Sequence, residues 1–316
     1  MKRSLLLVPL LLLAGCASPA PAAVVPSTEP VSVDNCGFEV TLDAAPERIV
    51  AIKSTSTELL LALGLGERII GTAFQDGPLP SELEPEASLT EIAPQMPSEE
   101  ALLDLEPDFV FSGWESAFTP DAAGDRDELA GLGIGTYVSP AACKEAGYKP
   151  AKLSFDELFA EITEAGTVFG AADAAAALVA EQSAMLATVT PDTTGKTALW
   201  WSSGDDTPYV GAGIGAPQMM LEALGLTNIA ADVNDTWSPL GWEAIVAANP
   251  DVIVLVDASW NTADSKKAYL ASNPATANLD AVINERYLVV PFAAGEAGVR
   301  SVEAATSLSA QLSALK

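Results

Sequence analysis

The sequence of 316 residues contains no histidine, and this absence excludes several kinds of catalytic chemistry. A Ser-His-Asp triad or a Cys-His pair uses an imidazole as its general base, so neither can be built from this chain. Paired carboxylates could still supply acid–base chemistry. No motif in the sequence supports such a pair, and we therefore expect no enzyme.

Positive charge is also scarce. The chain has 15 Lys and Arg against 43 Asp and Glu, a formal net charge of −28. Nucleic-acid binding depends on a basic face that displaces counterions from phosphates, which this balance does not provide. The excess of acid keeps the surface solvated and favours a monomer that binds no nucleic acid.

One of the three cysteines ends an apparent export signal. Lys2 and Arg3 precede an apolar run, Leu5 to Leu13, that is too short to span a bilayer. The run ends in Leu-Ala-Gly-Cys16, which resembles the lipobox of bacterial lipoproteins. The resemblance implies a signal peptide at 1–15, cleavage before Cys16 and a lipid anchor on that residue, outside the cytoplasm. An ordinary secretory signal with a coincidental cysteine is the alternative.

Cys36 and Cys143 remain after this assignment. Outside the cytoplasm an even pair favours a disulfide over two free thiols. Such a bond would close a loop of about a hundred residues, for which chain entropy predicts a stabilisation of nearly 5 kcal/mol.

The rest of the chain contains a short internal repeat. Glu100-Ala101 begins an amphipathic segment that leads through Pro107-Asp108 into the apolar strand 109–111, and Glu243-Ala244 leads through Pro250-Asp251 into the strand 252–256. A second echo, Ala-Leu-Gly-Leu at 62–65 and again at 223–226, precedes a strand in each half. Two echoes in the same order predict two similar α/β lobes.

Between the repeats lies a segment that predicts a connecting helix. Residues 154–169 have an apolar helical face and are interrupted at Gly166 and Gly170; residues 171–189 are rich in helix formers and stop at Pro191. We expect an uninterrupted helix of roughly 28 Å here. The expected domains are a lipidated tether and N-terminal hairpin at 16–43, an α/β lobe at 44–169, an interlobe helix at 170–190 and a second α/β lobe at 191–316.

Candidate ligand-binding residues follow the predicted strands, because open α/β sheets bind ligands at the carboxyl ends of their strands. In the first lobe the hydroxyl-rich stretch 54–57 also begins a helix, which favours an anion there. Large aromatics in loops add an apolar lining suited to a planar ligand. The candidates are Lys53, Thr55, Phe74, Gln75, Trp114, Glu115 and Ser139 in the first lobe, and Trp201, Ser202, Tyr209, Trp237, Asp257, Trp260 and Arg300 in the second. The glycines at 211–215 do not match a nucleotide-binding loop, because they lack both Gly-Lys-Ser/Thr and the G-x-G-x-x-G spacing.

Several of these segments together resemble the substrate-binding lipoproteins of ABC importers, in the class that handles iron–siderophore complexes, haem and cobalamin. The resemblance covers the mature chain and is carried by ERIVAIKSTSTELLLALGLGERIIG, SEEALLDLEPDFVFSG and GWEAIVAANPDVIVLVD. It implies two lobes joined by a rigid helix, and an ABC permease with its ATPase as partners. It also places Glu100 and Glu243 at the positions that pair with permease arginines, although both could be ordinary helix-start acids.

The ligand is less constrained. Relatives that bind zinc or manganese use histidines, so we expect neither a metal site nor a cofactor. The segments KSTSTE, AFQDGP, GWESAF and YVSPAACK are similar to a smaller actinobacterial branch assigned to a precursor of the deazaflavin coenzyme. For such a ligand we expect Trp114, Trp201 and Trp237 to stack on the ring system and Lys53 and Arg300 to neutralise an anionic arm. A ferric siderophore or a corrinoid is the alternative ligand.

Two other functions stay open at this stage. Glu115 and Asp257 could form the carboxylate pair of a glycoside hydrolase, and the same fold could serve as a surface co-receptor without transport.

Overall fold

The computed structural model describes residues 30–83 and 89–315. Among these residues no helix is long and apolar enough to cross a membrane. The predicted signal peptide, Cys16 and the tether up to residue 29 lie outside the described residues.

The chain begins with a hairpin, β1 (Val31–Asn35) and β2 (Phe38–Leu42), whose turn residues Cys36 and Gly37 both have positive φ. Two positive φ values in a two-residue turn suit the right-handed twist of the strands. Cys36 forms a disulfide with Cys143, with 5.3 Å between the Cα atoms. The predicted bond is therefore confirmed, and it ties the hairpin to the end of the first sheet.

The first half contains a parallel sheet in the order β5-β4-β3-β6-β7. Its strands are β3 (Ile49–Ile52), β4 (Ile69–Ala73), β5 (Glu91–Ala93), β6 (Phe109–Ser112) and β7 (Gly135–Val138). Its helices are α1 (Ser54–Ala62), α2 (Glu99–Leu103), α3 (Arg126–Gly131) and α4 (Phe155–Val168). Single 3₁₀ turns at 66–68, 81–83, 115–117 and 140–142 join these elements.

The second half contains a mixed sheet in the order β11-β9-β8-β12-β13, with β10 also paired to β8. Its strands are β8 (Thr197–Ser203), β9 (Tyr209–Gly211), β10 (Thr227–Asn228), β11 (Trp237–Pro239), β12 (Val252–Asp257) and β13 (Tyr287–Pro291). Its helices are α6 (Ala216–Ala223), α7 (Trp242–Ala248), α8 (Ala263–Ser272), α9 (Asp280–Ile283) and α10 (Ser301–Ala314), with a 3₁₀ turn at 292–295. The expected α/β class with two similar halves is confirmed.

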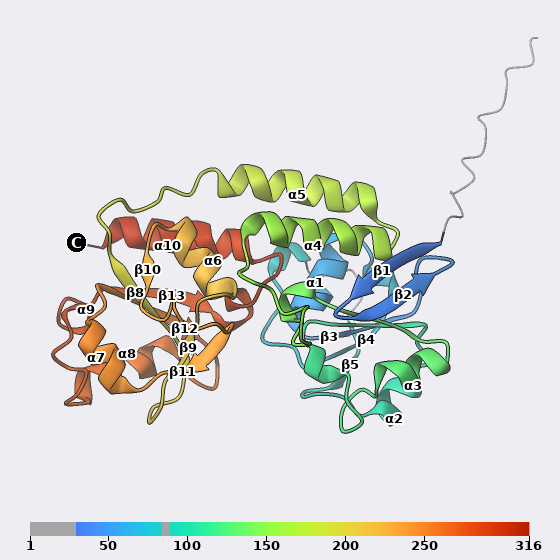
Figure 1. Cartoon of the computed structure of the whole chain (residues 1–316), viewed down its shortest axis with the longest axis horizontal. Helices are drawn as coiled ribbons and strands as arrows, with labels where there is room; N and C mark the ends of the chain where they lie inside the picture. Colours follow the sequence, from blue (N-terminus) through green and yellow to red (C-terminus); the bar gives the residue numbers. More distant parts are fainter. Residues whose placement is uncertain (1–29, 84–88, 316) are drawn as a thin grey trace, which may run out of the picture.

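The halves are joined by α5 (Ala172–Leu186), which lies over α4 and then passes the chain to the second sheet (Figure 1). Its 15 residues correspond to roughly 22 Å, shorter than predicted, because the helix ends at Leu186 and does not continue to Val189. The predicted interruption at Gly166 is wrong, because α4 continues through this residue to Val168. The glycine instead allows α5 to pack closely, since a Cβ at this position would come 2.3 Å from the Cβ of Ala175. Gly170, with φ +67, is the residue at which the chain turns between the two helices.

One apolar core continues through both halves. It combines residues of β3 and β6 with α1 and α4 in the first half, and residues of β8, β12 and β13 with α6 and α10 in the second. Side chains of α5, including Leu178 and Val179, pack against it. Separate clusters fill the opposite faces of the two sheets, under α2 and α3 and under α7 and α8. Because the shared core runs beneath the connecting helix, the halves are packed together as well as linked by the chain.

Candidate functional site

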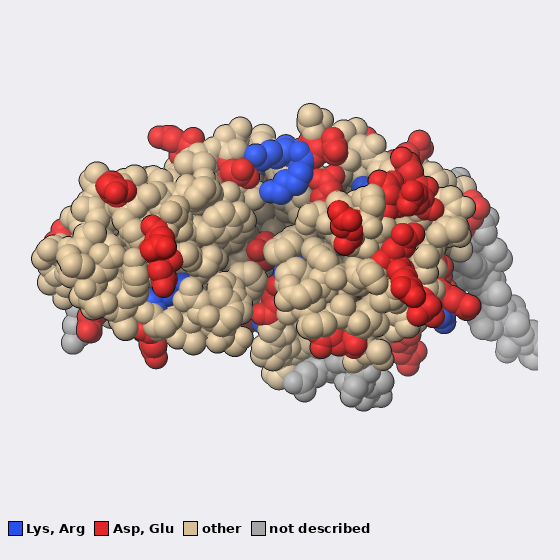
Figure 2. Space-filling model, turned by 90° about the horizontal axis from the view of Figure 1, so that it is seen from below, with Lys and Arg blue, Asp and Glu red and all other residues tan. Residues whose placement is uncertain are grey.

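A cavity of about 410 Å³ lies between the two halves and is lined by both. On the side of the molecule that is lowest in Figure 1, the surface is hollowed between the halves, and lysine or arginine side chains gather on one rim of the hollow (Figure 2). The predicted site residues that line the cavity are Trp114, Glu115, Ser202, Tyr209, Trp237 and Trp260. The sequence did not predict the other lining residues, which are Ser116, Ala141, Ala142, Lys144, Leu153, Ser203, Gly215, Ala216, Thr236, Phe292, Glu296 and Ala297.

Five aromatic side chains contribute to the walls of the cavity. The rings of Tyr209 and Trp237 are nearly parallel, with centroids 6.2 Å apart and an interplanar angle of 13°. These residues belong to the antiparallel pair β9 and β11, in which Trp237 is opposite Gly211 and Tyr209 is opposite Pro239. Trp260 meets Phe292 edge-on at 5.7 Å, and 63% of Trp260 remains exposed. These exposed faces provide a surface on which a flat ligand could stack.

Trp114 has a buried cation beneath it. It follows β6, and its ring lies 3.7 Å from the Nζ atom of Lys53, the residue that follows β3. Lys53 Nζ also lies 4.2 Å from the ring of Phe74, which follows β4 and meets Trp114 edge-on. All three residues come from the carboxyl ends of adjacent parallel strands, as the sequence predicts. Gly113 permits this close approach, because a Cβ there would lie 2.2 Å from Thr55 Oγ1.

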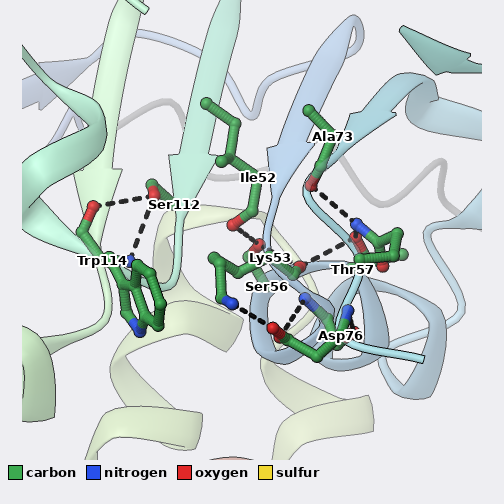
Figure 3. Close-up of polar contacts among 10 residues, drawn as sticks. Ile52, Lys53, Ser56, Thr57, Ala73, Asp76, Ser112 and Trp114 are labelled. Carbon is green, nitrogen blue, oxygen red and sulfur yellow. Dashed lines mark hydrogen bonds and ion pairs between the residues drawn. The ribbon is translucent and has the colours of Figure 1, made fainter. Parts of the chain in front are cut away.

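The prediction that Lys53 contacts the ligand is wrong, because the residue does not line the cavity. Its side chain is 1% exposed and forms an ion pair with the equally buried Asp76, so it cannot neutralise a ligand directly. Figure 3 shows the Lys53 side chain between Trp114 and Asp76. The Asp76 carboxylate also accepts a hydrogen bond from Ser54 N at 3.4 Å, and Asp76 N donates to Ser54 Oγ at 2.8 Å.

The predicted anion site at the start of α1 is therefore already filled by the protein. The helix begins at Ser54, earlier than expected, and the four hydroxyl residues 54–57 are buried. Ser56 Oγ donates to the carbonyls of Ile52 and Lys53 at 2.6 and 2.9 Å, and Thr57 Oγ1 donates to Lys53 O at 3.1 Å (Figure 3). Gln75 is used within this network as well, donating to Thr57 Oγ1 at 3.1 Å and to Ala73 O at 3.0 Å.

Arg300 is a second correction. Its guanidinium forms a bidentate ion pair with Glu58 of α1, at 2.7 Å for Nε, and donates to Pro78 O at 2.8 Å. Burial raises the pKa of Glu58 above its usual value, and the hydrogen bonds and charge of Arg300 offset only part of this rise. Arg300 thus joins the second half to the first and is not available to an anionic ligand arm.

The other predicted residues lie away from the cavity. Trp201 is fully buried, and it packs edge-on against Trp242 with centroids 5.2 Å apart because its side chain points to the α7 and α8 face of the sheet. Asp257 accepts a hydrogen bond from Ala263 N at 2.7 Å at the start of α8. Thr55 and Ser139 line a small internal space of about 20 Å³ between α1, α4 and residues 297–299.

Among the acidic side chains that line the cavity, Glu296 has the pKa that lies furthest from its usual value. Burial raises its pKa to about 7, against the lowering effects of Lys53, the Trp114 indole and Lys144; Asp76 adds to the rise. The residue follows β13 and the 292–295 turn, so the strand-end rule could have found it. Lys144 carried no such signal, because it follows a 3₁₀ turn next to Cys143.

The Lys144 segment crosses to the second half. Lys144 Nζ donates to Thr236 Oγ1 at 3.2 Å, and Lys149 Nζ donates to Asn234 O at 3.0 Å and lies 3.5 Å from Asp235. Lys152 pairs with Glu222, and Leu153 N donates to Ile214 O at 2.8 Å. In residues 30–83 and 89–315 no cluster of three or more acidic, histidine or cysteine side chains could hold a metal ion.

Comparison with known proteins agrees with this architecture. The chain is 29% identical over 245 residues to a cobalamin-binding protein of Halobacterium salinarum; the match covers 72% of this chain and 58% of that relative. It is 28% identical over 265 residues to YvrC, an uncharacterized ABC transporter substrate-binding lipoprotein of Bacillus subtilis, covering 80% and 79% of the two chains.

Solved structures show the same fold. A periplasmic binding protein from Veillonella parvula superposes with a TM-score of 0.79 at 24% identity, covering 90% of this chain and 97% of that one. An ABC-type Fe3+-hydroxamate transport system protein from Saccharomonospora viridis gives 0.76 at 26% identity, covering 90% and 99%. Two lobes around one interlobe cavity, with residues 49–294 matching the family pattern, place this chain in the periplasmic binding protein family.

Proposed function

We propose that this chain is the extracytoplasmic substrate-binding subunit of an ABC importer, held at the membrane by a lipid on Cys16. In this role it captures a small molecule between its halves and delivers it to a permease and its ATPase. The family assignment and the two relatives support binding over catalysis.

The observation that carries this proposal is the aromatic cavity built from both halves. Trp114 comes from the first sheet, and Tyr209, Trp237 and Trp260 come from the second. A cavity of about 410 Å³ is within the range of small-molecule sites, which is about 300–1,000 Å³. Planar conjugated molecules and metal chelates suit such walls. We propose a deazaflavin coenzyme precursor, a ferric siderophore or a corrinoid as the ligand.

The proposal is tested by titrating the tryptophan fluorescence of the soluble form, which starts after Cys16. The panel consists of a ferric hydroxamate siderophore, haem, cobinamide and a deazaflavin precursor. Saturable quenching by one of them supports the proposal and identifies the ligand class. No quenching by any compound, together with no co-purifying small molecule in native mass spectrometry, would contradict it.

Glu100 and Glu243 are the proposed contacts with the permease. Glu100 is the second residue of α2 and Glu243 is the second residue of α7, and both are exposed. In each half the helix is followed by Pro-Asp and then by a strand. Both helices lie toward the lower edge of the molecule in Figure 1. We expect the double variant Glu100→Lys and Glu243→Lys to abolish uptake while the soluble protein keeps its ligand affinity. Uptake that survives both reversals would favour a co-receptor without transport.

The hydrolase alternative receives no support from the geometry. Glu115 lines the cavity, but Asp257 is used at the start of α8 and is not part of the cavity lining. The carboxylate pair that the sequence left open is therefore not assembled in one site.

A further inference from the structure

The charged groups around the cavity are arranged to accept hydrogen bonds and positive charge. Lys53 and Arg300, the two cations expected to meet a ligand, are held by Asp76 and Glu58. Of the charged side chains that line the cavity in the described part of the chain, Glu115 and Glu296 are acidic and Lys144 is basic.

Lys144 adds little positive potential to the interior. Its side chain is 57% exposed, its Nζ atom lies 3.9 Å from Asp235, and it donates to Thr236 Oγ1. The helix N-terminus that could have bound an anion is satisfied by Asp76. An anionic ligand would thus meet Glu296, Glu115 and electron-rich ring faces without a free cation deep in the site. The Glu115 carboxylate already accepts the backbone N–H of Lys144, so Glu296 is the more available acceptor. Ring faces attract cations, and buried carboxylates bind cations and N–H or O–H donors strongly.

We propose that the cavity selects ligands that present positive charge or hydrogen-bond donors and rejects anionic ones, with Glu296 as the accepting group that sets this preference. The inference rests on the proposed function and deepens it, since it gives the charge class of the substrate. Glu296 is suited to this role because it lines the cavity together with Trp114 and Phe292, and the Trp114 indole donates a hydrogen bond to its carboxyl group.

The environment of Glu296 gives the preference a pH dependence. The charges of Lys53, Asp76 and Lys144 and the hydrogen bond from the Trp114 indole affect the pKa of Glu296. Burial raises the pKa of Tyr209, and the charge of Glu296 adds to this rise. Because the pKa of Glu296 is raised to about 7, its carboxyl is mostly neutral at pH 6 and mostly ionised at pH 8. A cationic ligand should therefore bind more tightly as the pH rises through 7.

The experiment compares ligand pairs that differ in charge on one scaffold. The pairs are ferrioxamine B, with its free ammonium group, against its N-acetyl form; riboflavin against its phosphate FMN; and cobinamide against cobyric acid. Affinities are measured by fluorescence titration at pH 6 and pH 8. In each pair that binds, we expect the more positive member to be favoured by about tenfold at pH 8. The ferrioxamine pair, whose charges are constant over this range, should show a smaller preference at pH 6.

Three variants test whether Glu296 causes the preference for the more positive ligand. Glu296→Gln should remove both the preference and its pH dependence, Glu296→Asp should retain part of both, and Glu303→Gln, on the exposed face of α10, should retain them fully. Circular dichroism and thermal unfolding establish that each variant is folded. Tighter binding of the more negative members, or a preference that survives Glu296→Gln, would overturn this inference and leave the proposed function intact. No binding by any member of the three pairs would overturn this inference. It would contradict the proposed function as well only if haem and the deazaflavin precursor also fail to bind and no small molecule co-purifies.

Discussion

Lys53 supports the cavity wall from behind, with a side chain that is only 1% exposed and does not line the cavity. Its backbone has φ 84° and ψ 152°, a region that side chains other than glycine occupy only at a cost of about 1–3 kcal/mol. The surrounding structure holds it there through the Asp76 ion pair, the faces of Trp114 and Phe74, and the first turn of α1. We infer that the cation serves to position the Trp114 wall.

Asp76→Asn would leave the Lys53 ammonium buried without its counter-charge. We expect a loss of about 3–5 kcal/mol in the free energy of unfolding, measured by urea denaturation. The control Asp264→Asn removes the partner of Lys267 in an exposed pair, where the Asp264 side chain is 92% exposed, and should leave stability unchanged. Equal stability of Asp76→Asn and the wild type would show that the pair does not hold Lys53.

Glu161 in α4 makes stability depend on pH. Burial, with smaller contributions from Glu164 and Glu157, raises the pKa of its carboxyl to about 8, against one backbone hydrogen bond from Ala141. Because the folded state keeps the proton that the unfolded state releases near pH 4.5, the stabilising contribution is complete below that pH and is lost as the pH rises to 8.

We therefore expect Glu161→Gln to match the wild type at pH 4.5 and to melt several degrees higher above pH 8. Thermal unfolding followed by circular dichroism between these pH values measures the difference. The control Glu181→Gln, at an exposed position of α5, should show no such trend. A difference in melting temperature that is constant with pH would refute the assignment.

At the scale of elements, the aspartate of the Pro-Asp repeat accepts backbone hydrogen bonds at the start of a neighbouring strand in both halves. Asp108 before β6 accepts hydrogen bonds from Glu47 N and Arg48 N at 2.9 and 3.0 Å, just ahead of β3. Asp251 before β12 accepts from Thr197 N at 2.8 Å, at the start of β8. In each half the carboxylate fixes the start of the neighbouring parallel strand. The repeated Pro-Asp sequence therefore corresponds to the same interaction between neighbouring strands in each half.

The contact between α4 and α5 tests how the connecting helix is seated. Gly166→Ala would bring its Cβ within 2.3 Å of Ala175 Cβ, so we expect a destabilisation of about 1–3 kcal/mol despite the better helix propensity of alanine. Gly131→Ala in α3 is the matched control, since a Cβ there meets no atom within 4 Å. Urea unfolding of both variants gives the comparison. A Gly166→Ala variant at least as stable as Gly131→Ala would mean that the two helices are not closely packed.

Most elements could be predicted from the sequence because their signals are local. The apolar runs 109–111 and 287–290 indicate β6 and β13, and Ser154 with Glu157 forms the capping box at the start of α4. The site was less predictable because it depends on side-chain direction. Trp200 and Trp201 are adjacent in one strand and necessarily face opposite sides of the sheet, and neither ring lines the cavity. The pairing of Lys53 with Asp76 depends on two strand ends that only the folded sheet brings together.

At the scale of the whole molecule, side chains tie the two halves together at two places. Arg300 pairs with Glu58 at one of them, and the segment with Lys144, Lys149 and Lys152 contacts residues 222–236 at the other. The apolar core beneath α5 is shared between the halves. These contacts favour a cavity that is formed before the ligand arrives, in which little conformational free energy is spent on closure.

The central claim is that the ligand binds between the halves against the aromatic walls. It is tested most directly by titrating ferrioxamine B, cobinamide and a deazaflavin precursor into the wild type and the double variant Tyr209→Ala and Trp237→Ala. Tyr148→Ala, an exposed aromatic outside the cavity, is the control. We predict that a compound bound by the wild type and by Tyr148→Ala loses at least about tenfold in affinity in the folded double variant. Undiminished binding by the double variant would place the ligand elsewhere and contradict the account.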